Sequence, residues 1–538
     1  MLGNLVRAKN DACAVVFVRD ALGRVIEERV GEHVIESRYN ASGRRIRRAT
    51  NLGHETFYDF DGNGGLLGVT FGVDPRWMDF SPESLATGGP VRAPWKATFA
   101  RDALGNEVER QLPGGVVARW DRDSFGRPQA HRVRRGDERV QDIDYRWRSY
   151  EQLAELIDAE NGPTRLQHDA RSYLVAASRP NGTIEYRAPD AVGNIYRDSE
   201  RTDRRYGKGC RLEEFAGAQY THNEDGQLLE KKAPDGSRWR YAWDQDGQLQ
   251  AVTRSDGQKA TFAYDALGRR VKKTFAGKTT TYIWDGDDLV HEVIENAALV
   301  TWVFEPGTFA PLAKVEGEAR YGIVTDHLGT PQVLFDEAGV LAWKAQLDLY
   351  GVARTDTKRT SCLLRWPGQY EDEETGLYYN RFRYYDPESG RYISQDPIRL
   401  LGGLISYGYA DDPVSWTDPL GLVACDKLTR QTRALTAQEI LDHVFDRHAT
   451  DFLGIAAKKS SDLQAFTNIL DKLRRSGLTF KYNLGGTPVL GHLARYEGRY
   501  AAIFFFDGGV HAGEVASAFY PRPKQLSTIF SIVSRKGP

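Results

Sequence analysis

The stretch Asp20–Arg24 reads DALGR, and variants of it return along the chain about every twenty residues. The shared pattern is Asp or Asn, two spacer residues, Gly, and then Arg, Asn or Gln. A period of this size is typical of a repeat architecture, in which each unit buries its apolar side only by stacking on its neighbours. The further copies are Asn40–Arg44, Asp59–Asn63, Asp102–Asn106, Asp123–Arg127, Asp190–Asn194, Asn223–Gln227, Asp244–Gln248 and Asp265–Arg269.

Each copy combines a turn with alternating strands. The Asp side chain can accept hydrogen bonds from backbone amides ahead of it, and the Gly supplies the positive φ angle that a tight hairpin bend requires. Between the glycines, apolar or aromatic residues alternate with polar ones, as in Thr261–Tyr264 and Thr279–Trp284. This period of two predicts β-hairpins, and successive hairpins should build a long, twisted antiparallel ribbon.

The repeated Tyr-Asp and Gly-Arg phrases resemble the YD repeats of RHS proteins, a group that includes the C components of insecticidal toxin complexes and the teneurins. The resemblance implies a mainly β fold in which the hairpin ribbon coils into a hollow β-cocoon. Ser172 stands where the pattern has Gly, so we expect this turn to bend differently, and residues 128–188 and 286–325 carry weak repeats or none. The alternative is an ordinary β protein with incidental Asp-Gly turns, which the sustained register disfavours.

A denser motif occupies residues 365–422 and ends in Asp-Pro-Leu-Gly-Leu. Together with the upstream phrase Asp326–Pro331, it resembles the RHS-associated core domain. The resemblance implies that the core is an internal aspartyl protease, that Asp396 and Asp418 are its two carboxylates, and that it cuts the chain between Leu422 and Val423.

Peptide hydrolysis by carboxylates needs a pair, because one must be ionised to take a proton from water while the other stays protonated to polarise the carbonyl. Arg399 follows the Asp396-Pro397 step and can lower the pKa of a carboxylate that it faces. The alternative is that Asp-Pro steps are only turns, since Asp caps the backbone and Pro fixes φ. We expect the turn role for Asp326, Asp386 and Asp412.

The composition sets limits on the class of protein. At 538 residues the chain is too long for one hydrophobic core. Its four cysteines lie far apart and match no metal-binding or dense disulfide pattern, so we expect no metal and no cofactor. No apolar run reaches the length of about 20 residues that crosses a bilayer, and the first residues lack a signal-peptide core.

The segment from Val423 to Pro538 differs from the rest in charge, with 16 Lys and Arg against 10 Asp and Glu. A capping box at Thr436 and an apolar stripe predict a first helix, and residues 461–475 predict a second. The period then changes to two over 478–483, 488–496, 499–506, 514–519 and 527–533, which predicts strands. This order predicts a small α+β domain.

The residue types of this last domain suit a metal-independent ribonuclease, which needs an acid, a base and cations for the phosphate. We assign His443 and His448 as acid and base and Arg447 as a phosphate contact, with Lys481 and His492 as further candidates. The order of elements resembles compact toxin ribonucleases of the barnase, EndoU, colicin D and RelE group. The two helix histidines are five residues apart, about 140° around the helix, so they need not share a face.

Other roles for this domain stay open. An ADP-ribosyltransferase would use an Arg, a Ser-Thr strand and a Glu, and Arg499, Ser527 and Glu514 supply those types without a convincing arrangement. A zinc deaminase needs Cys-x-x-Cys, whereas the domain has one cysteine. A non-enzymatic adhesive module is the third alternative, and the helix histidines and basic charge argue weakly against it.

The sequence thus predicts a YD-repeat shell at 1–325, a core at 326–422 and a C-terminal toxin domain at 423–538. The family resemblance implies an interbacterial toxin delivered by type VI secretion on a VgrG spike and a PAAR domain, with a cognate immunity protein. The severed toxin is expected to stay non-covalently associated with the shell and to act on RNA in the target-cell cytoplasm.

Overall fold

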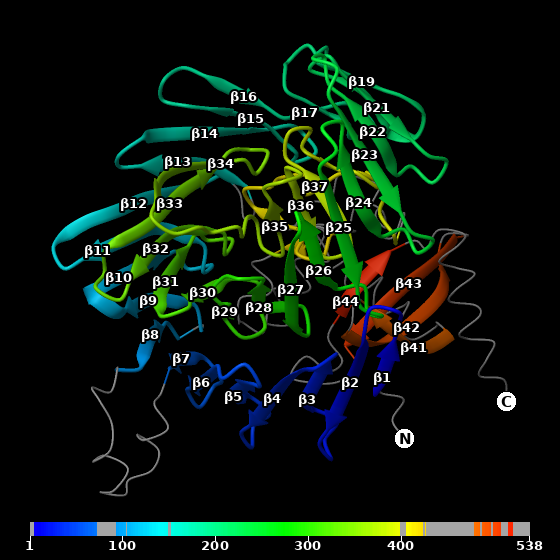
Figure 1. The fold of residues 1–538 in the computed structure, drawn as a ribbon. Helices are drawn as coiled ribbons and strands as arrows, with labels where there is room; N and C mark the ends of the chain where they lie inside the picture. Colours follow the sequence, from blue (N-terminus) through cyan, green and yellow to red (C-terminus); the bar gives the residue numbers. More distant parts are fainter. Residues whose placement is uncertain are drawn as a thin grey trace, which may run out of the picture. The chain divides into compact units, whose positions relative to one another are not determined.

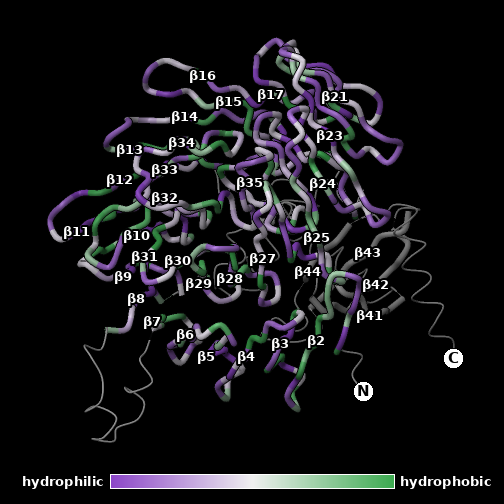
Figure 2. Tube along the Cα trace, in the orientation of Figure 1, coloured by the Kyte–Doolittle hydropathy of each residue, from purple (hydrophilic) through white to green (hydrophobic). Residues whose placement is uncertain are grey.

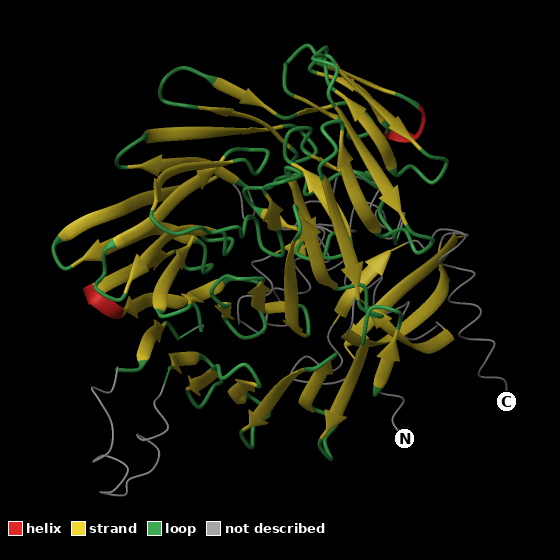
Figure 3. Ribbon diagram, in the orientation of Figure 1, coloured by secondary structure: helices red, strands yellow, loops and turns green. Residues whose placement is uncertain are grey.

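The computed structural model describes residues 5–72, 93–103, 105–148, 152–398, 405–422, 425–426, 478–484, 487–496, 499–506 and 515–519. Within these residues the secondary structure is strand, apart from two single 3-10 turns, Pro113–Gly115 and Lys208–Cys210 (Figure 3). The chain separates into two compact units, residues 1–431 and 432–538. The prediction of a mainly β protein is confirmed.

Two large antiparallel sheets make up most of the first unit, and in each the strands pair strictly in chain order (Figure 1). The first sheet consists of β1 (Arg7–Lys9), β2 (Ala14–Arg19), β3 (Val25–Val30), β4 (His33–Tyr39), β5 (Arg45–Thr50), β6 (Glu55–Phe60), β7 (Leu66–Phe71), β8 (Trp95–Arg101), β9 (Glu107–Leu112), β10 (Val116–Arg122), β11 (Pro128–Arg135), β12 (Glu138–Trp147), β13 (Leu153–Asp158), β14 (Gly162–His168), β15 (Leu174–Ser178) and β16 (Ile184–Tyr186). This order is that of successive hairpins, so the predicted ribbon is confirmed.

A two-stranded sheet, β17 (Ala188–Pro189) with β18 (Ile195–Tyr196), leads to the second large sheet. Its strands are β19 (Arg204–Tyr206), β20 (Leu212–Phe215), β21 (Ala218–His222), β22 (Leu228–Lys232), β23 (Arg238–Trp243), β24 (Leu249–Arg254), β25 (Lys259–Tyr264), β26 (Arg270–Phe275), β27 (Lys278–Asp285), β28 (Asp288–Ile294), β29 (Val300–Phe304), β30 (Pro311–Glu316), β31 (Ala319–Thr325), β32 (Pro331–Asp336), β33 (Leu341–Leu347) and β34 (Ala353–Lys358). The ribbon therefore also runs through the segments with weak repeats, and it continues across Thr325.

The smaller sheets follow. β35 (Tyr370–Asp372), β36 (Leu377–Asn380), β37 (Arg383–Asp386) and β38 (Arg391–Tyr392) pair in order, and β39 (Trp416–Thr417) pairs with β40 (Cys425–Asp426). In the second unit, β41 (Leu478–Leu484), β42 (Thr487–Tyr496), β43 (Arg499–Phe506) and β44 (Val515–Phe519) form an antiparallel sheet. These four strands confirm the predictions for 478–519 to within one residue at most ends. The predicted helices and the predicted strand 527–533 lie outside the described residues.

The repeat turn works as predicted. In the first copy the Asp20 carboxylate accepts the amides of Leu22 and Arg24 at 3.0 Å each, and the Gly23 amide donates to the Asp20 carbonyl at 2.9 Å with φ 82° at the glycine. The pairing of β2 with β3 shifts by one residue beside this turn, as expected for a hairpin with a bulge.

Two details of the repeat differ from expectation. Ser172 has φ 68°, and its amide donates to the Asp169 carbonyl at 3.0 Å, so its turn is the same as the others and the expected different bend is wrong. A serine adopts this left-handed conformation because Asp169 supplies the same two carboxylate bonds as in the other copies. The third copy is displaced by two residues, because Asp61 rather than Asp59 accepts the turn amides at 2.8 Å.

The two large sheets pack on each other through apolar residues and ion pairs. Val69, Trp95 and Val116 of the first sheet lie in one cluster with Leu312 and Phe335 of the second. Figure 2 shows apolar segments along the strands and mostly hydrophilic colour at the hairpin ends near β16 and β21. The alternating burial of strands such as β8 and β10 follows from this packing.

Ion pairs join residues more than 200 positions apart. Arg269 Nη1 donates to Glu28 Oε1 at 2.6 Å, and Arg101 Nη2 donates to Glu305 Oε1 at 2.7 Å. All four side chains are at most 10% exposed. Because an unpaired buried charge is costly, such pairs fix which hairpins of the two sheets face each other.

Candidate aspartate site

The small sheet β35–β38 carries the residues around Asp396. Strands β36, β37 and β38 are buried throughout, and β37 places Arg383 on the same sheet as Tyr392 of β38. Leu377, Tyr379 and Tyr384 belong to the same apolar cluster as the second large sheet. The site is therefore built on a rigid, packed support.

Asp396 follows β38 and is 4% exposed. Its amide donates to the Ser406 carbonyl at 2.9 Å, and its Oδ1 accepts the Ile398 amide at 2.9 Å. Burial raises the pKa of the Asp396 carboxyl to about 6, with a smaller upward contribution from the Asp418 charge, while Arg383 and the Ile398 amide act in the opposite direction. The carboxyl thus exchanges its proton in the range where a catalytic acid is useful.

Asp418 lies after β39 and is 1% exposed. Its Oδ1 accepts the Leu422 amide at 2.8 Å, and its Oδ2 accepts the Tyr392 hydroxyl at 2.9 Å and Arg383 Nη2 at 3.1 Å. Its backbone carbonyl also accepts Asn380 Nδ2 at 2.9 Å. The three donors to the carboxylate complement a negative charge and fix its orientation, and Asn380 holds the backbone beside it.

Arg383 joins the two carboxylates. Its Nη2 lies 3.1 Å from Asp396 Oδ2 and 3.1 Å from Asp418 Oδ2, and its Nε donates to the Gly421 carbonyl. The guanidinium lies over the Tyr392 ring, 3.6 Å from its centroid. One cation therefore gathers two carboxylates 22 positions apart in the chain and the backbone next to Leu422.

The segment around Leu422 is a short loop between paired strands. Trp416 pairs with Asp426 and Thr417 with Cys425, so β39 and β40 lie on either side of the Leu422–Val423 bond in the sequence. Gly421 has φ 67°, and a Cβ there would come within 2.5 Å of the Asn380 carbonyl oxygen, so only glycine fits. The loop is held close to the small sheet on its N-terminal side.

The structure brings Asp396, Asp418 and Leu422 together, as the cleavage hypothesis requires. Val423 and Arg399 lie outside the described residues, and so do His443, Arg447 and His448. The backbone places Lys481 opposite Leu490 of β42, two positions from His492, which pairs with Thr479. The roles of these payload residues stay predictions.

The three aspartates expected to form turns do so. Asp326 Oδ1 accepts two amides at 2.8 Å, Asp386 Oδ1 accepts the Glu388 amide at 3.0 Å, and Asp412 Oδ1 accepts the Val414 amide at 3.2 Å.

The sequence analysis missed Arg383, Tyr392 and Asn380. All three lie within the core motif at residues 365–422, but a polar side chain in a short buried strand gives no sign of its partner 26 to 38 residues away. The one available signal was Arg383, because a charged residue in a buried strand is rare unless it is paired.

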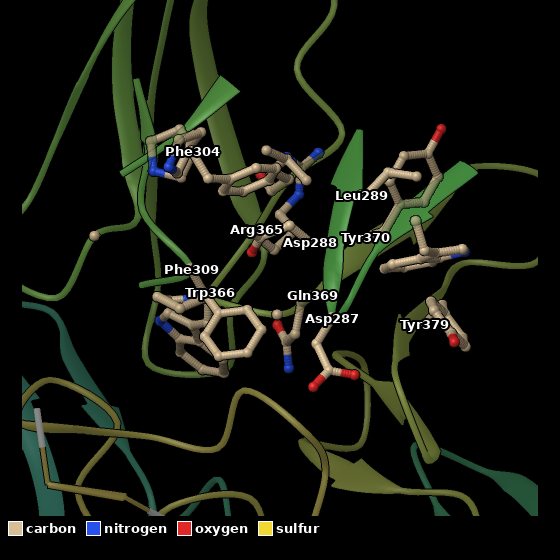
Figure 4. A pocket seen from close by; sticks show the side chains of 17 residues that line it. Asp287, Asp288, Leu289, Phe304, Phe309, Arg365, Trp366, Gln369, Tyr370 and Tyr379 are labelled. Carbon is tan, nitrogen blue, oxygen red and sulfur yellow. The ribbon is translucent and has the colours of Figure 1, made fainter. Parts of the chain in front are cut away.

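A separate apolar cavity of about 40 Å³ lies between β27–β28 and the loop 364–370. Figure 4 shows Phe304, Phe309 and Trp366 on one side and Tyr370 and Tyr379 on the other. This volume holds no more than a few water molecules, and neither Asp396 nor Asp418 lines it. We therefore regard this cavity as a packing gap between the second large sheet and the segment 364–370 rather than a substrate site.

In the part of the chain that the structure describes, no group of three or more His, Cys, Asp or Glu side chains is arranged to hold a metal ion. Nor does that part contain a helix long and apolar enough to span a bilayer.

The chain was compared with known proteins. It is 33% identical over 375 residues to the double-stranded DNA deaminase toxin A of Burkholderia cenocepacia, and the matched stretch covers 61% of this chain and 26% of that protein. It is 30% identical over 506 residues to the toxin protein Tse5 of Pseudomonas aeruginosa, and the matched stretch covers 78% of this chain and 37% of that protein. The chain thus spans about a quarter to two fifths of these relatives' length.

The fold is similar to that of a solved structure. The crystal structure described as TcdB2-TccC3-Cdc42 matches with a TM-score of 0.57 at 15% identity, over 80% of this chain and 24% of that chain. The model of the family described as Teneurin YD-shell matches residues 119–401, which is more than half of the chain. Together with the consecutive hairpins, this match shows that the chain belongs to the Teneurin YD-shell family of RHS/YD-repeat proteins.

Proposed function

We propose that this chain is the shell, self-cleaving core and toxic payload of an interbacterial toxin, and that Asp396 and Asp418 cut it between Leu422 and Val423. One observation carries the cleavage assignment. The Arg383 guanidinium lies 3.1 Å from both carboxylates, and the second of these holds the Leu422 amide at 2.8 Å. A pair of carboxylates beside a defined peptide bond is the arrangement that acid-base hydrolysis requires.

The two carboxyls have different roles in this proposal. Asp396, whose pKa is raised to about 6, is the protonated partner and polarises the Leu422 carbonyl oxygen. Asp418, surrounded by donors, is the carboxylate that takes a proton from the attacking water. The hydroxide adds to the Leu422 carbonyl carbon, the bond to the Val423 nitrogen breaks, and the proton passes to that nitrogen as the new amino terminus forms.

The payload stays with the shell after the cut. The new N-terminal segment contains β40, whose backbone pairs with β39 on the other side of the cut. Two residues of pairing are weak alone, so we propose that enclosure by a hollow ribbon shell supplies the rest of the non-covalent association. Retention protects the producing cell until delivery.

We propose that the payload is a metal-independent ribonuclease acting in the target-cell cytoplasm. The support is its excess of basic residues, which attracts a polyanion, and the candidate set His443, Arg447, His448, Lys481 and His492. The names of two relatives describe toxins, one of them a DNA deaminase, which supports a toxic payload in general terms. An ADP-ribosyltransferase or another NAD-dependent enzyme is the alternative.

Delivery belongs to the same proposal. We propose release by type VI secretion with a VgrG spike and a PAAR domain, and neutralisation in the producing cell by a cognate immunity protein. The similarity to Tse5 over 78% of the chain supports this family of functions.

The cleavage assignment is tested with full-length variants. Asp396→Asn and Asp418→Asn should leave the 60.5 kDa chain intact, whereas the parent yields a separate payload. Asp386→Asn is the matched control, because this aspartate is also buried, ends β37 of the same small sheet, and accepts the Glu388 amide of a turn. Equal processing of all four proteins would remove the aspartate assignment.

The payload assignment is tested by expressing residues 423–538 in bacteria and examining their RNA directly. We expect RNA fragmentation that His443→Ala or His448→Ala abolishes. Growth arrest with intact RNA would exclude the ribonuclease and favour NAD-dependent modification.

A further inference from the structure

The segment that leads into the cleavage loop, residues 409–414, is held by the end of the first large sheet. We call these residues the docking segment. Leu174 of β15 donates its amide to the Asp411 carbonyl at 3.1 Å. Arg187, between β16 and β17, donates from Nη2 to the Ala410 carbonyl at 2.7 Å and from Nη1 to the Asp411 carbonyl at 3.1 Å. Each of these contacts spans more than 220 positions of the chain.

A buried histidine completes the contact. His168, the last residue of β14, has its Nε2 3.0 Å from Asp412 Oδ2, and both side chains are 2% exposed. The other ring nitrogen of His168, Nδ1, is buried without a partner. The contact with Asp412 is therefore the one hydrogen bond that the His168 ring makes.

The anchored aspartate controls the start of the loop. Asp412 accepts the Val414 amide with Oδ1, and its carbonyl accepts the amides of Ser415 and Trp416 at 3.1 and 2.8 Å. This turn leads directly into β39, and Asp418 follows β39. Val414 packs on the apolar cluster of β12–β15, which fixes the turn from the other side.

Only five residues lie between Asp412 and Asp418, and they form a hydrogen-bonded turn and a paired strand. A shift of the docking segment is therefore transmitted to the catalytic carboxylate. Misplacement of a reacting group by about 1 Å can slow a reaction about a hundredfold.

We propose that His168 and Arg187 are positioning residues for the cleavage reaction, which bring Asp418 to Asp396 only when the end of the first sheet has docked on the core. This inference rests on the proposed cleavage between Leu422 and Val423, and it adds the contacts that decide when cleavage occurs. Neither residue touches the scissile bond. The chain is then cut after strands β14–β16 are in place, so a payload is not severed from an unfinished shell.

The experiment follows cleavage of the full-length chain after dilution from denaturant, by gel electrophoresis. His168→Ala and Arg187→Ala should slow cleavage at least about tenfold. His168→Gln should restore the rate to within about threefold of the parent, because the Gln Nε2 can donate to Asp412 from a similar position. A purely structural loss of packing would not be rescued by this polar replacement.

Two control variants separate an effect on the position of Asp418 from a general loss of stability. His291→Ala removes a buried histidine that bonds Thr50 and Thr301, and Arg110→Ala removes a buried arginine bonded to Glu107 and the Ile323 carbonyl. His291 lies in β28 and Arg110 in β9, and the hydrogen bonds named above for them do not involve the docking segment. They should lower the thermal unfolding midpoint as much as the docking variants do, yet cleave at the parent rate.

Cleavage of folded His168→Ala and Arg187→Ala at the parent rate would overturn the inference, and so would equal slowing in the two wall controls. If the alanine variants do not fold, slow cleavage by folded Arg187→Lys, which loses one of two carbonyl bonds, supports the inference and parent-rate cleavage refutes it. Asp396→Asn in the same series tests cleavage itself. Processing of that variant would end the proposed function, whatever the docking variants do.

Discussion

The raised pKa of Asp396 makes the cleavage rate depend on pH in a defined direction. As the acid, Asp396 must be protonated, and its pKa is about 6 against 3.8 for an ordinary aspartate. The protonated fraction is about 0.9 at pH 5, about 0.09 at pH 7 and about 0.01 at pH 8. Cleavage should therefore slow about tenfold from pH 5 to pH 7 and about a hundredfold from pH 5 to pH 8.

The same shift affects stability with a fixed sign. The folded chain holds the Asp396 proton more tightly than the unfolded chain, so the stabilisation is complete below pH 3.8 and is lost as pH rises through about 6. A difference of about two pKa units corresponds to about 3 kcal/mol at this buried position. The acid range thus favours both cleavage and the contribution of Asp396 itself to stability.

The assay uses full-length chain purified uncut from inclusion bodies in denaturant. The chain is diluted into buffers from pH 5 to pH 8, samples are quenched in acid and the intact band is quantified. Tryptophan fluorescence followed in parallel separates the rate of folding from the rate of cleavage. A cleavage rate that stays constant or rises between pH 5 and pH 8, at equal folding, would refute the assignment of Asp396 as the acid.

Three further predictions concern the shell. Ser172→Gly should raise the free energy of unfolding by up to about 1 kcal/mol, because Ser172 holds φ 68°, where glycine is unstrained. Gly23→Ala should lower the free energy of unfolding by about 1–2 kcal/mol for the same reason. Denaturant titration measures both changes, and a less stable Ser172→Gly variant would contradict the turn argument. Arg270→Met should cost about 3–5 kcal/mol, since it leaves the buried Asp372 with Lys273 alone. Arg119→Met, which removes the exposed pair with Glu109, should change stability by less than about 0.5 kcal/mol, and equal effects of the two arginine variants would show that burial does not decide the cost.

The sequence predicts the parts of this fold that depend on neighbouring residues. Asp20 and Gly23 specify a hairpin through contacts no more than four residues apart, and the same chemistry repeats along the ribbon. Ser172 shows the limit of the rule, because the Asp169 carboxylate holds the turn even where glycine is missing. The third copy shows a second limit of the rule, since Asp59 and Asp61 are two residues apart and only Asp61 forms the turn.

Long-range pairing could not be predicted in this way. The family resemblance selected Asp396 and Asp418, but nothing local to either residue names Arg383, which joins them. Likewise, His168 and Asp412 are 244 positions apart, and each alone is a common turn or strand-end residue. Such partners are set by how the two sheets and the core pack, which depends on many weak apolar contacts at once.

The exact mass of the smaller product tests the central claim most directly. Intact-mass spectrometry of the refolded parent chain should give a fragment that begins at Val423 and ends at Pro538, while Asp396→Asn and Asp418→Asn should give only the full-length chain. A fragment that begins elsewhere, or the same fragment from both aspartate variants, would contradict the account.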